Sequence, residues 1–163
     1  MSKVTIYTDG ASKGNPGDAG IGVVITAEDG TVLAEIGEYI GKTTNNVAEY
    51  SALIRGLTEA AELGATTLEI STDSELMARQ LAGIYKVKSP LLRPLYEQAV
   101  TLLRHFRKVS ISHVFRECNK RADELANEGV KKHNAAIKIE TKPAKAAQRS
   151  AARKEPEQRE LGF

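Results

Sequence analysis

The hydrophobic pattern of this chain changes its period near residue 45, and that change limits the possible folds more than any single motif does. Strand-like alternation comes first, in three runs at Val4 to Thr8, Gly20 to Thr26 and Thr31 to Ile40. Helical spacing follows over residues 46–63 and stops at Gly64. Because alternation of period two indicates a strand and spacing near 3.6 indicates a helix, the sequence predicts an antiparallel opening followed by a helix.

The rest of the chain alternates between short strands and helices. We expect a strand at Thr67 to Thr72, helices at 74–83 and from Pro90 to about Phe106, a strand at Val109 to Val114 and a helix from about Lys120 to His133. The order β-β-β-α-β-α-α-β-α predicts an α/β fold in which helices cover the faces of a mixed sheet. Active sites in such folds favour the carboxyl ends of the parallel strands.

Length and cysteine content indicate a single intracellular domain. The 163 residues suffice for one packed core without disulfides or structural metal. Cys118 is the only cysteine, so no intramolecular disulfide can form, and a reducing compartment, the cytoplasm, is expected. No stretch approaches the roughly 20 apolar residues that span a bilayer, so we expect no membrane partner.

The composition changes at Asn134, where Ala, Lys, Arg, Glu and Gln come to dominate. A segment of this composition cannot bury a core of its own. We therefore expect a folded domain at residues 1–133 and a basic Ala/Lys/Glu-rich tail at residues 134–163. The tail is expected to be flexible or weakly helical, as an extension without a binding role.

Charge is distributed unevenly within the predicted domain. Residues 79–121 contain ten Lys or Arg and only two acidic residues, whereas the remainder of residues 1–133 is net acidic. An acidic region beside a basic one suits a polyanion that metal ions bridge to the protein. The alternative is that these charges only keep helix surfaces soluble.

Four acidic residues stand where the predicted elements begin or end. Asp9 follows the first strand and Asp73 follows the fourth, while Glu49 and Asp123 lie in the first turns of helices. Asn46, three residues before Glu49, also resembles a capping box. Each acid alone is typical of a helix or strand terminus, but together the four could converge at one edge of the sheet. Neighbouring carboxylates repel each other, and a divalent cation favours the ionised form of both.

The ligands in this set are all oxygen atoms, with no His or Cys pattern nearby. Oxygen ligands favour Mg²⁺, with Mn²⁺ as a substitute, over zinc. Two such ions about 3.5–4 Å apart can activate a water molecule and stabilise the leaving oxygen in phosphoryl displacement. The residues therefore indicate metal-dependent hydrolysis of a phosphodiester, without a protein nucleophile.

The segments around these acids resemble the ribonuclease H type 1 family. The resemblance covers about residues 2–132 and rests on TDGASKGNPG, TNNVAE, TDS and NKRADELA, which occur in the family's order and spacing. It implies a five-stranded mixed sheet, with three antiparallel and two parallel strands. It also implies a Mg²⁺-dependent endoribonuclease that cuts the RNA strand of RNA–DNA hybrids by two-metal-ion catalysis. The products would carry 5′-phosphate and 3′-hydroxyl ends. Independently of the resemblance, a monomer is the default expectation.

The resemblance assigns roles to individual residues of this chain. The catalytic and metal-binding carboxylates would be Asp9, Glu49, Asp73 and Asp123. The substrate-binding positions would be Gly10 and Ser12 at ribose 2′-hydroxyls, Asn15, Asn45 and Asn46 in the minor groove, Thr44 at a DNA-strand phosphate, and Arg116 and Asn119 in the loop before the fourth carboxylate. Contacts of this kind distinguish a hybrid from other duplexes, because the 2′-hydroxyl marks RNA and groove shape marks the hybrid.

Two features depart from the best-known members of the family. The loop FRECNKR has Arg116 and Asn119 where many members have a histidine, and its arginine resembles that of archaeal-like members. The segment KVKSP stands where some members have a long, Trp-containing basic protrusion, and this chain contains no Trp. Alternative activities are cleavage of double-stranded RNA, dual specificity, or binding of nucleic acid without catalysis.

Overall fold

The computed structural model describes residues 3–140, with side chains as far as Ala136. Its elements follow the predicted order, with one addition, a short 3-10 helix (η1) before the last helix. They are β1 (Lys3–Gly14), β2 (Gly17–Ala27), β3 (Val32–Thr43), α1 (Asn45–Glu62), β4 (Thr67–Thr72), α2 (Glu75–Leu81), α3 (Arg93–Leu103), β5 (Lys108–His113), η1 (Arg116–Asn119) and α4 (Lys120–Glu140).

The five strands form one mixed sheet in the order β3-β2-β1-β4-β5, which confirms the predicted fold class. β1, β2 and β3 pair in antiparallel fashion, while β4 runs parallel to β1 and β5 runs parallel to β4. The parallel pairing of β1 with β4 ends at Thr8 and Thr72. The antiparallel pairing of β1 with β2 continues to Gly14 and Gly17. Asp9 therefore does not end its strand, as the sequence pattern predicted, but lies within it, one residue past the parallel ladder.

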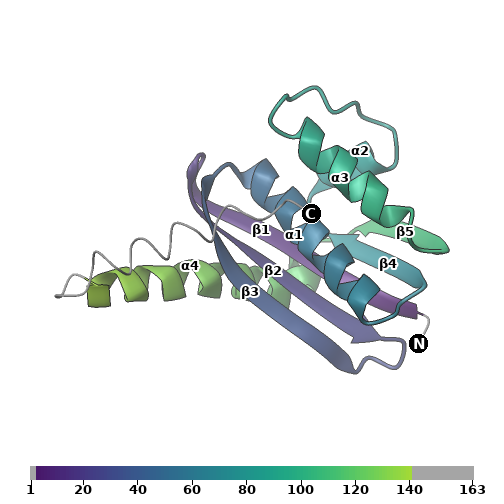
Figure 1. The fold of residues 1–163 in the computed structure, drawn as a ribbon, viewed down its shortest axis with the longest axis horizontal. Coiled ribbons are helices and arrows are strands. Elements are labelled where there is room, and N and C mark those ends of the chain that lie inside the picture. Colours follow the sequence, from purple (N-terminus) through teal and green to yellow (C-terminus); the bar gives the residue numbers. More distant parts are fainter. Residues whose placement is uncertain (1–2, 141–163) are drawn as a thin grey trace.

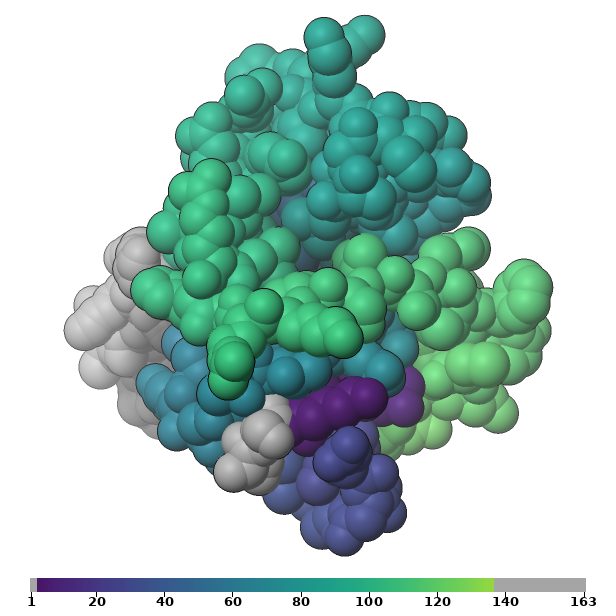
Figure 2. Space-filling model, turned by 90° about the vertical axis from the view of Figure 1, so that its right-hand side faces the viewer, coloured from purple at the N-terminus to yellow at the C-terminus, as the bar shows by residue number. Residues whose placement is uncertain are grey.

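Helices cover both faces of the sheet (Figure 1). α1 packs on β1 and β2 and is joined by α3, whereas α4 packs on the opposite face against β2, β3 and β1. Seen from the end at which β1 begins, α1 and α4 lie on opposite sides of that strand (Figure 2). The core beneath α1 contains the fully buried side chains of Ile6, Ile25, Tyr50, Leu53 and Leu57. Burial of a large apolar side chain contributes about 1.5–3 kcal/mol, so this layer anchors the sheet to α1.

Glycines in β2 let α4 lie close to the face of the sheet beneath it. A Cβ atom at Gly22 would clash with the backbone oxygen of Ala122, and one at Gly20 would clash with that of Ala126. Gly22 is also the direct partner of Asp9 in the β1–β2 register. The missing side chains let the backbone of α4 touch the sheet, so Gly22 sets the height of the helix beside Asp9.

α4 extends further than the sequence pattern predicted. It runs to Glu140, whereas the expected helix ended at His133. The ring of His133 stacks on Tyr39 of β3, with centroids 3.6 Å apart. The proposed division of the chain at Asn134 thus falls inside a helix, and the remainder of the predicted tail, residues 141–163, lies outside the described residues. Within residues 3–140, no helix has the length and apolar character needed to cross a bilayer.

We expect Gly22→Ala to lower the free energy of unfolding by about 1–3 kcal/mol, because the added methyl group overpacks the contact between β2 and α4. Urea denaturation monitored by circular dichroism measures this change. Asn134→Ala, an exposed position on the same helix, is the matched control and should change stability by less than about 0.5 kcal/mol. Equal stability of Gly22→Ala and the parent protein would show that α4 can move away from the sheet freely.

Candidate active site

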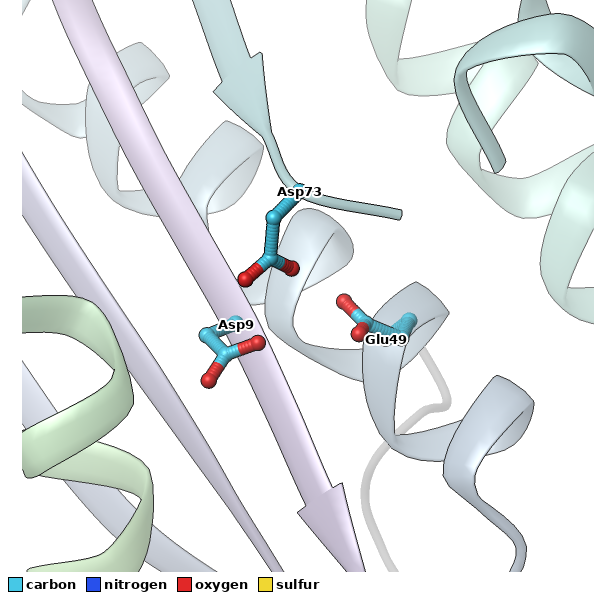
Figure 3. A group of neighbouring side chains, drawn as sticks. All are labelled: Asp9, Glu49 and Asp73. Carbon is cyan, nitrogen blue, oxygen red and sulfur yellow. The ribbon is translucent and has the colours of Figure 1, made fainter. Parts of the chain in front are cut away.

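Three of the four predicted carboxylates converge at one end of the sheet. Asp9 comes from β1, Asp73 directly follows β4, and Glu49 lies near the start of α1. Each can offer a carboxylate oxygen, and these oxygens lie within 4.8 Å of one another. Figure 3 shows the side chains of Asp9, Asp73 and Glu49 directed toward a common point. The expectation that separate motifs would meet is confirmed for these three residues.

The parallel ladder places Asp9 beside Asp73. Thr8 and Thr72 are its last paired residues, and the two aspartates are the next residues along the chain. Both threonines are fully buried, which fixes the strand ends against the core. The two carboxylates thus meet at the carboxyl edge of the parallel part of the sheet, where sites in such folds are expected.

Close contact between α1 and β1 places Glu49. A Cβ atom at Gly10 would clash with the carbonyl carbon of Ala48, so only glycine lets the first turns of α1 lie this close to the strand. The N-cap of α1 is Thr44, whose Oγ1 accepts a hydrogen bond from the Val47 backbone N–H at 3.3 Å. The predicted capping box at Asn46 is therefore wrong. The side chain of Glu49 is turned into the site and does not cap the helix. Its carboxylate accepts a hydrogen bond from the backbone N–H of Gly10.

Burial and mutual repulsion disfavour the charged forms of these acids. The pKa of Asp9 is raised to about 9, first by burial, then by the charge of Glu49, by a hydrogen bond with the Asp123 side chain and by the charge of Asp73. Burial and the charge of Asp73 raise the pKa of Glu49 to about 8, although the Gly10 N–H and the charge of Arg116 act in the opposite direction. Without a cation, the cluster therefore retains protons at neutral pH.

The residues fit a divalent cation. Glu49 is 8% exposed, and its Oε1 is buried without a hydrogen-bond partner among the described residues. A buried, unpartnered carboxylate oxygen is costly unless a charge or donor offsets it. An all-oxygen set of three clustered carboxylates suits a hard cation such as Mg²⁺ or Mn²⁺. A bound cation would also remove the repulsion that raises the pKa values of Asp9 and Glu49.

Asp123, the fourth predicted carboxylate, stands beside the other three. It lies in the first turn of α4, is half-buried, and contacts Asp9 through the side-chain hydrogen bond described above. It does not belong to the set whose oxygens all lie within 4.8 Å of one another. The sequence pattern thus located Asp123 correctly near Asp9, but the close cluster consists of Asp9, Glu49 and Asp73.

Asn127 is a neighbour of the site that the sequence analysis missed. Its Nδ2 donates to the backbone oxygen of Asp123 at 2.9 Å, and its Oδ1 accepts from the Lys13 ammonium at 2.8 Å. It thereby ties the tip of the β1–β2 hairpin to the turn that contains Asp123. The signal was available in the sequence, because residues four apart lie on the same face of a helix.

The predicted minor-groove residues form a connected cluster at the β1–β2 turn and the start of α1. The Oδ1 atom of Asn15 accepts a hydrogen bond from the Asn45 backbone N–H at 2.9 Å. The Oδ1 atom of Asn45 accepts one from the Ser12 backbone N–H at 3.1 Å. Ser12 Oγ donates to the Thr43 carbonyl oxygen at 2.9 Å. These bonds use only the oxygen atoms of the two amides, so within residues 3–140 both NH₂ groups stay available as donors. Asn46 is exposed beside this cluster.

The loop before α4 separates the two substrate-binding residues predicted there. The side chain of Arg116 is 83% exposed, and its Nε lies 4.0 Å from Asp73 Oδ2. Asn119 is only 2% exposed, and its Nδ2 donates to the Thr8 carbonyl oxygen at 2.8 Å. Arg116 is thus placed at the rim of the site, whereas the side chain of Asn119 faces the protein interior and not a substrate surface.

A mixed five-stranded sheet of this order, with carboxylates just past the parallel pairing of β1 with β4, defines a ribonuclease H-like domain. A family described as reverse transcriptase-like matches residues 7–129. A ribonuclease HI from Halobacterium salinarum is 47% identical over 78% of this chain and 64% of its own length. The crystal structure of an RNase H1 from that archaeon superimposes with a TM-score of 0.79 and 46% identity, covering 80% of this chain and 99% of the other.

Further relatives are also ribonucleases H or contain a matching region. A ribonuclease H from Marinobacter nauticus is 35% identical, covering 82% of this chain and 98% of its own length. LC11-RNase H1, solved in complex with an RNA/DNA hybrid, has a TM-score of 0.76 and 47% identity, covering 80% of this chain and 98% of that one. A bifunctional protein from Mycobacterium tuberculosis is 46% identical, and the matched region spans 88% of this chain but 40% of the relative. The chain belongs to the ribonuclease H family of enzymes.

We expect the stability of the metal-free protein to fall as pH rises. Folding raises the pKa of Asp9 to about 9 and that of Glu49 to about 8. Between their ordinary values and these values, the folded state binds more protons than the unfolded state, so the free energy of unfolding decreases with pH. Each unit of pKa shift corresponds to about 1.4 kcal/mol, and the loss between pH 5 and pH 9 should exceed that amount.

Scanning calorimetry in EDTA from pH 5 to pH 9 measures this decline. Asp9→Asn removes the carboxylate with the largest shift and should flatten the profile. Glu69→Gln, an exposed acid on β4, serves as the control and should leave the slope unchanged. A profile for Asp9→Asn that is as steep as that of the parent protein would contradict the assignment.

Proposed function

We propose that this chain is a Mg²⁺-dependent endoribonuclease that cuts the RNA strand of RNA–DNA hybrids. The observation that carries the proposal is the cluster of Asp9, Glu49 and Asp73, in which one buried carboxylate oxygen has no hydrogen-bond partner in the part of the chain that the structure describes. Membership of the ribonuclease H family supports the same reaction. The products would carry 5′-phosphate and 3′-hydroxyl ends. We further propose a cytoplasmic monomer, in keeping with the free Cys118.

The carboxylates would hold two divalent ions, with Mn²⁺ as a substitute for Mg²⁺. Asp9, Glu49 and Asp73 would be the main ligands, and Asp123 would complete the set from the side of α4. When bound, the ions would supply an activated water molecule and charge stabilisation for the leaving oxygen. The protein would contribute the fixed positions of the carboxylates, which β1, β4, α1 and α4 hold from four directions.

The cluster of Ser12, Asn15 and Asn45 would recognise the hybrid. The free NH₂ groups of the two asparagines are suited to acceptors in a minor groove, where base edges present them. The backbone at Gly10 and Ser12 would meet ribose 2′-hydroxyls, which distinguish RNA from DNA. Asn46 would extend the groove contact, and Thr44, at the N-terminus of α1, would contact a phosphate of the DNA strand. The hybrid complex of LC11-RNase H1 supports this class of substrate.

Arg116 would act at the scissile phosphate. Its guanidinium stands beside Asp73, at the rim of the acidic cluster, and its side chain is otherwise solvent-exposed. A cation in this position can approach a phosphate oxygen or the leaving group while the carboxylates are engaged with metal. Because the distance to Asp73 is long and the arginine side chain is exposed, the pair contributes little to stability, which leaves the arginine free to exchange partners.

We expect hybrid-specific, metal-dependent cleavage. The experiment compares four labelled duplexes, RNA–DNA, DNA–RNA–DNA, double-stranded RNA and double-stranded DNA, in Mg²⁺, Mn²⁺ or EDTA. Asp73→Asn should reduce cleavage by more than the roughly 100-fold typical of residues outside the metal's ligand sphere. Exposed Glu75→Gln, two residues along the chain, is the matched control and should retain activity.

The outcomes separate the competing activities. Cutting of the RNA strand in hybrids only, in metal and not in EDTA, supports the proposal. Cutting of double-stranded RNA as well would establish dual specificity. Binding that persists in EDTA, with no cleavage of any substrate in Mg²⁺ or Mn²⁺, would identify a nucleic-acid-binding module. Full activity of Asp73→Asn would contradict the metal site.

Arg116→Ala should lower kcat by about 10-fold or more while KM changes less, because a contact made mainly in the transition state affects kcat. Single-turnover and steady-state rates on the hybrid separate chemistry from product release. Glu117→Gln, the exposed neighbour in η1, controls for local disturbance. Turnover and product release that equal those of the parent protein would exclude the role of Arg116.

A further inference from the structure

The segment 114–119 bridges β4 and β1 at the residues that precede the two aspartates. At one end, the Val114 backbone N–H donates to the Thr72 carbonyl oxygen at 2.8 Å. At the other end, Asn119 Nδ2 donates to the Thr8 carbonyl oxygen, also at 2.8 Å. Thr72 and Thr8 are the residues immediately before Asp73 and Asp9. Both ends of this bridging segment are therefore attached to peptide groups that adjoin carboxylates of the proposed site.

We propose that Asn119 is a positioning residue that holds Asp123 and Arg116 in register with Asp9. This inference rests on the proposed function. Asn119 ends η1, and α4 starts at the next residue, with Asp123 in its first turn. Its hydrogen bond joins residues 111 positions apart in the sequence and is buried. Because the bond ends on the peptide before Asp9, movement of α4 relative to Asp9 must stretch or break it.

The chemistry of the side chain supports positioning over substrate contact. Asn119 is 2% exposed, whereas Phe115 and Arg116 of the same segment are largely exposed. The Cys118 backbone N–H donates to the Phe115 carbonyl oxygen at 2.9 Å, which closes the turn between them. The bridging segment thus has an inner anchor and an outer surface. A substrate can meet Phe115 and Arg116 but has no access to the buried amide.

A neutral donor is the group that this position requires. The acceptor is a backbone carbonyl, so an aspartate would place an oxygen against an oxygen and add negative charge beside four carboxylates. The other amide atom, Oδ1, is buried without a partner among the described residues. A buried acceptor without a hydrogen bond lowers stability, so stability alone does not explain an asparagine at this position. Its bond to the Thr8 carbonyl is the interaction that explains why an amide is placed here.

The test compares Asn119→Ala and Asn119→Asp with Val130→Ala, a buried position further along α4 that lies outside the site. All three should lower Tm, the control because it leaves a cavity. Only the Asn119 variants should lower kcat on the hybrid, by about 10–100-fold, with KM changed less than about threefold, a loss of the size seen when residues that orient metal ligands from outside the ligand sphere are removed. They should also weaken Mg²⁺ binding, measured by calorimetry without substrate, by about 10-fold.

Amide hydrogen exchange provides a readout independent of activity. Exchange at residues 120–126 should accelerate in Asn119→Ala but not in Val130→Ala, because only the first releases the start of α4. If the wild type fails to cut hybrids, the proposed function fails, while Mg²⁺ binding and exchange still decide the role of Asn119. The inference is overturned if both Asn119 variants have a lower Tm but keep the wild-type kcat, Mg²⁺ affinity and amide exchange rates. It is also overturned if they raise KM alone, which would make Asn119 a substrate contact.

Discussion

Repulsion among buried carboxylates is the constraint on which the rest of this structure depends. Asp9 and Glu49 are nearly buried and lie beside Asp73, and this raises the pKa values of both. A relaxed chain would separate these groups or expose them to water. The fold prevents separation by giving each carboxylate to a different element and fixing those elements to one another through the apolar core. The site is therefore under electrostatic strain that packing elsewhere offsets.

Close backbone contact is the means by which the elements are fixed. Gly10 lets the start of α1 touch β1, and Gly22 lets α4 touch β2 on the opposite face. Asp9 lies directly before the first glycine and directly across the ladder from the second. One residue is thus flanked by both helix contacts, which explains how Glu49 and Asp123 reach it from opposite sides of the sheet. A side chain at either glycine would push the adjacent helix away from the sheet, and the carboxylate on that helix would move by more than a metal site tolerates.

The sequence predicted those parts of the fold that follow from periodicity. The change from alternation to helical spacing gave the element order, and the positions after strands indicated where Asp9 and Asp73 would meet. Strand length was underestimated for β1, because Gly10 to Gly14 lacks apolar alternation and is held by pairing with β2. The cap at Thr44 is a local bond to the Val47 N–H, and the sequence analysis missed it by choosing Asn46. The burial of Asn119 instead depends on a tertiary contact, to the carbonyl oxygen of Thr8. No local pattern distinguishes an amide that faces solvent from one that faces a strand.

Under the proposed function, the same repulsion links the cations to the substrate. Metal-free Asp9 and Glu49 hold protons at neutral pH, so cation binding must release them, and affinity for the cation rises with pH. Without cations, the acidic cluster offers a polyanion no attraction of its own, and Arg116 stands beside it as one exposed positive charge. Cation binding therefore favours substrate binding, and by thermodynamic reciprocity the substrate favours cation binding by the same factor. Burial of the carboxylates, which destabilises the free protein, makes this coupling strong, because charges interact more strongly away from water.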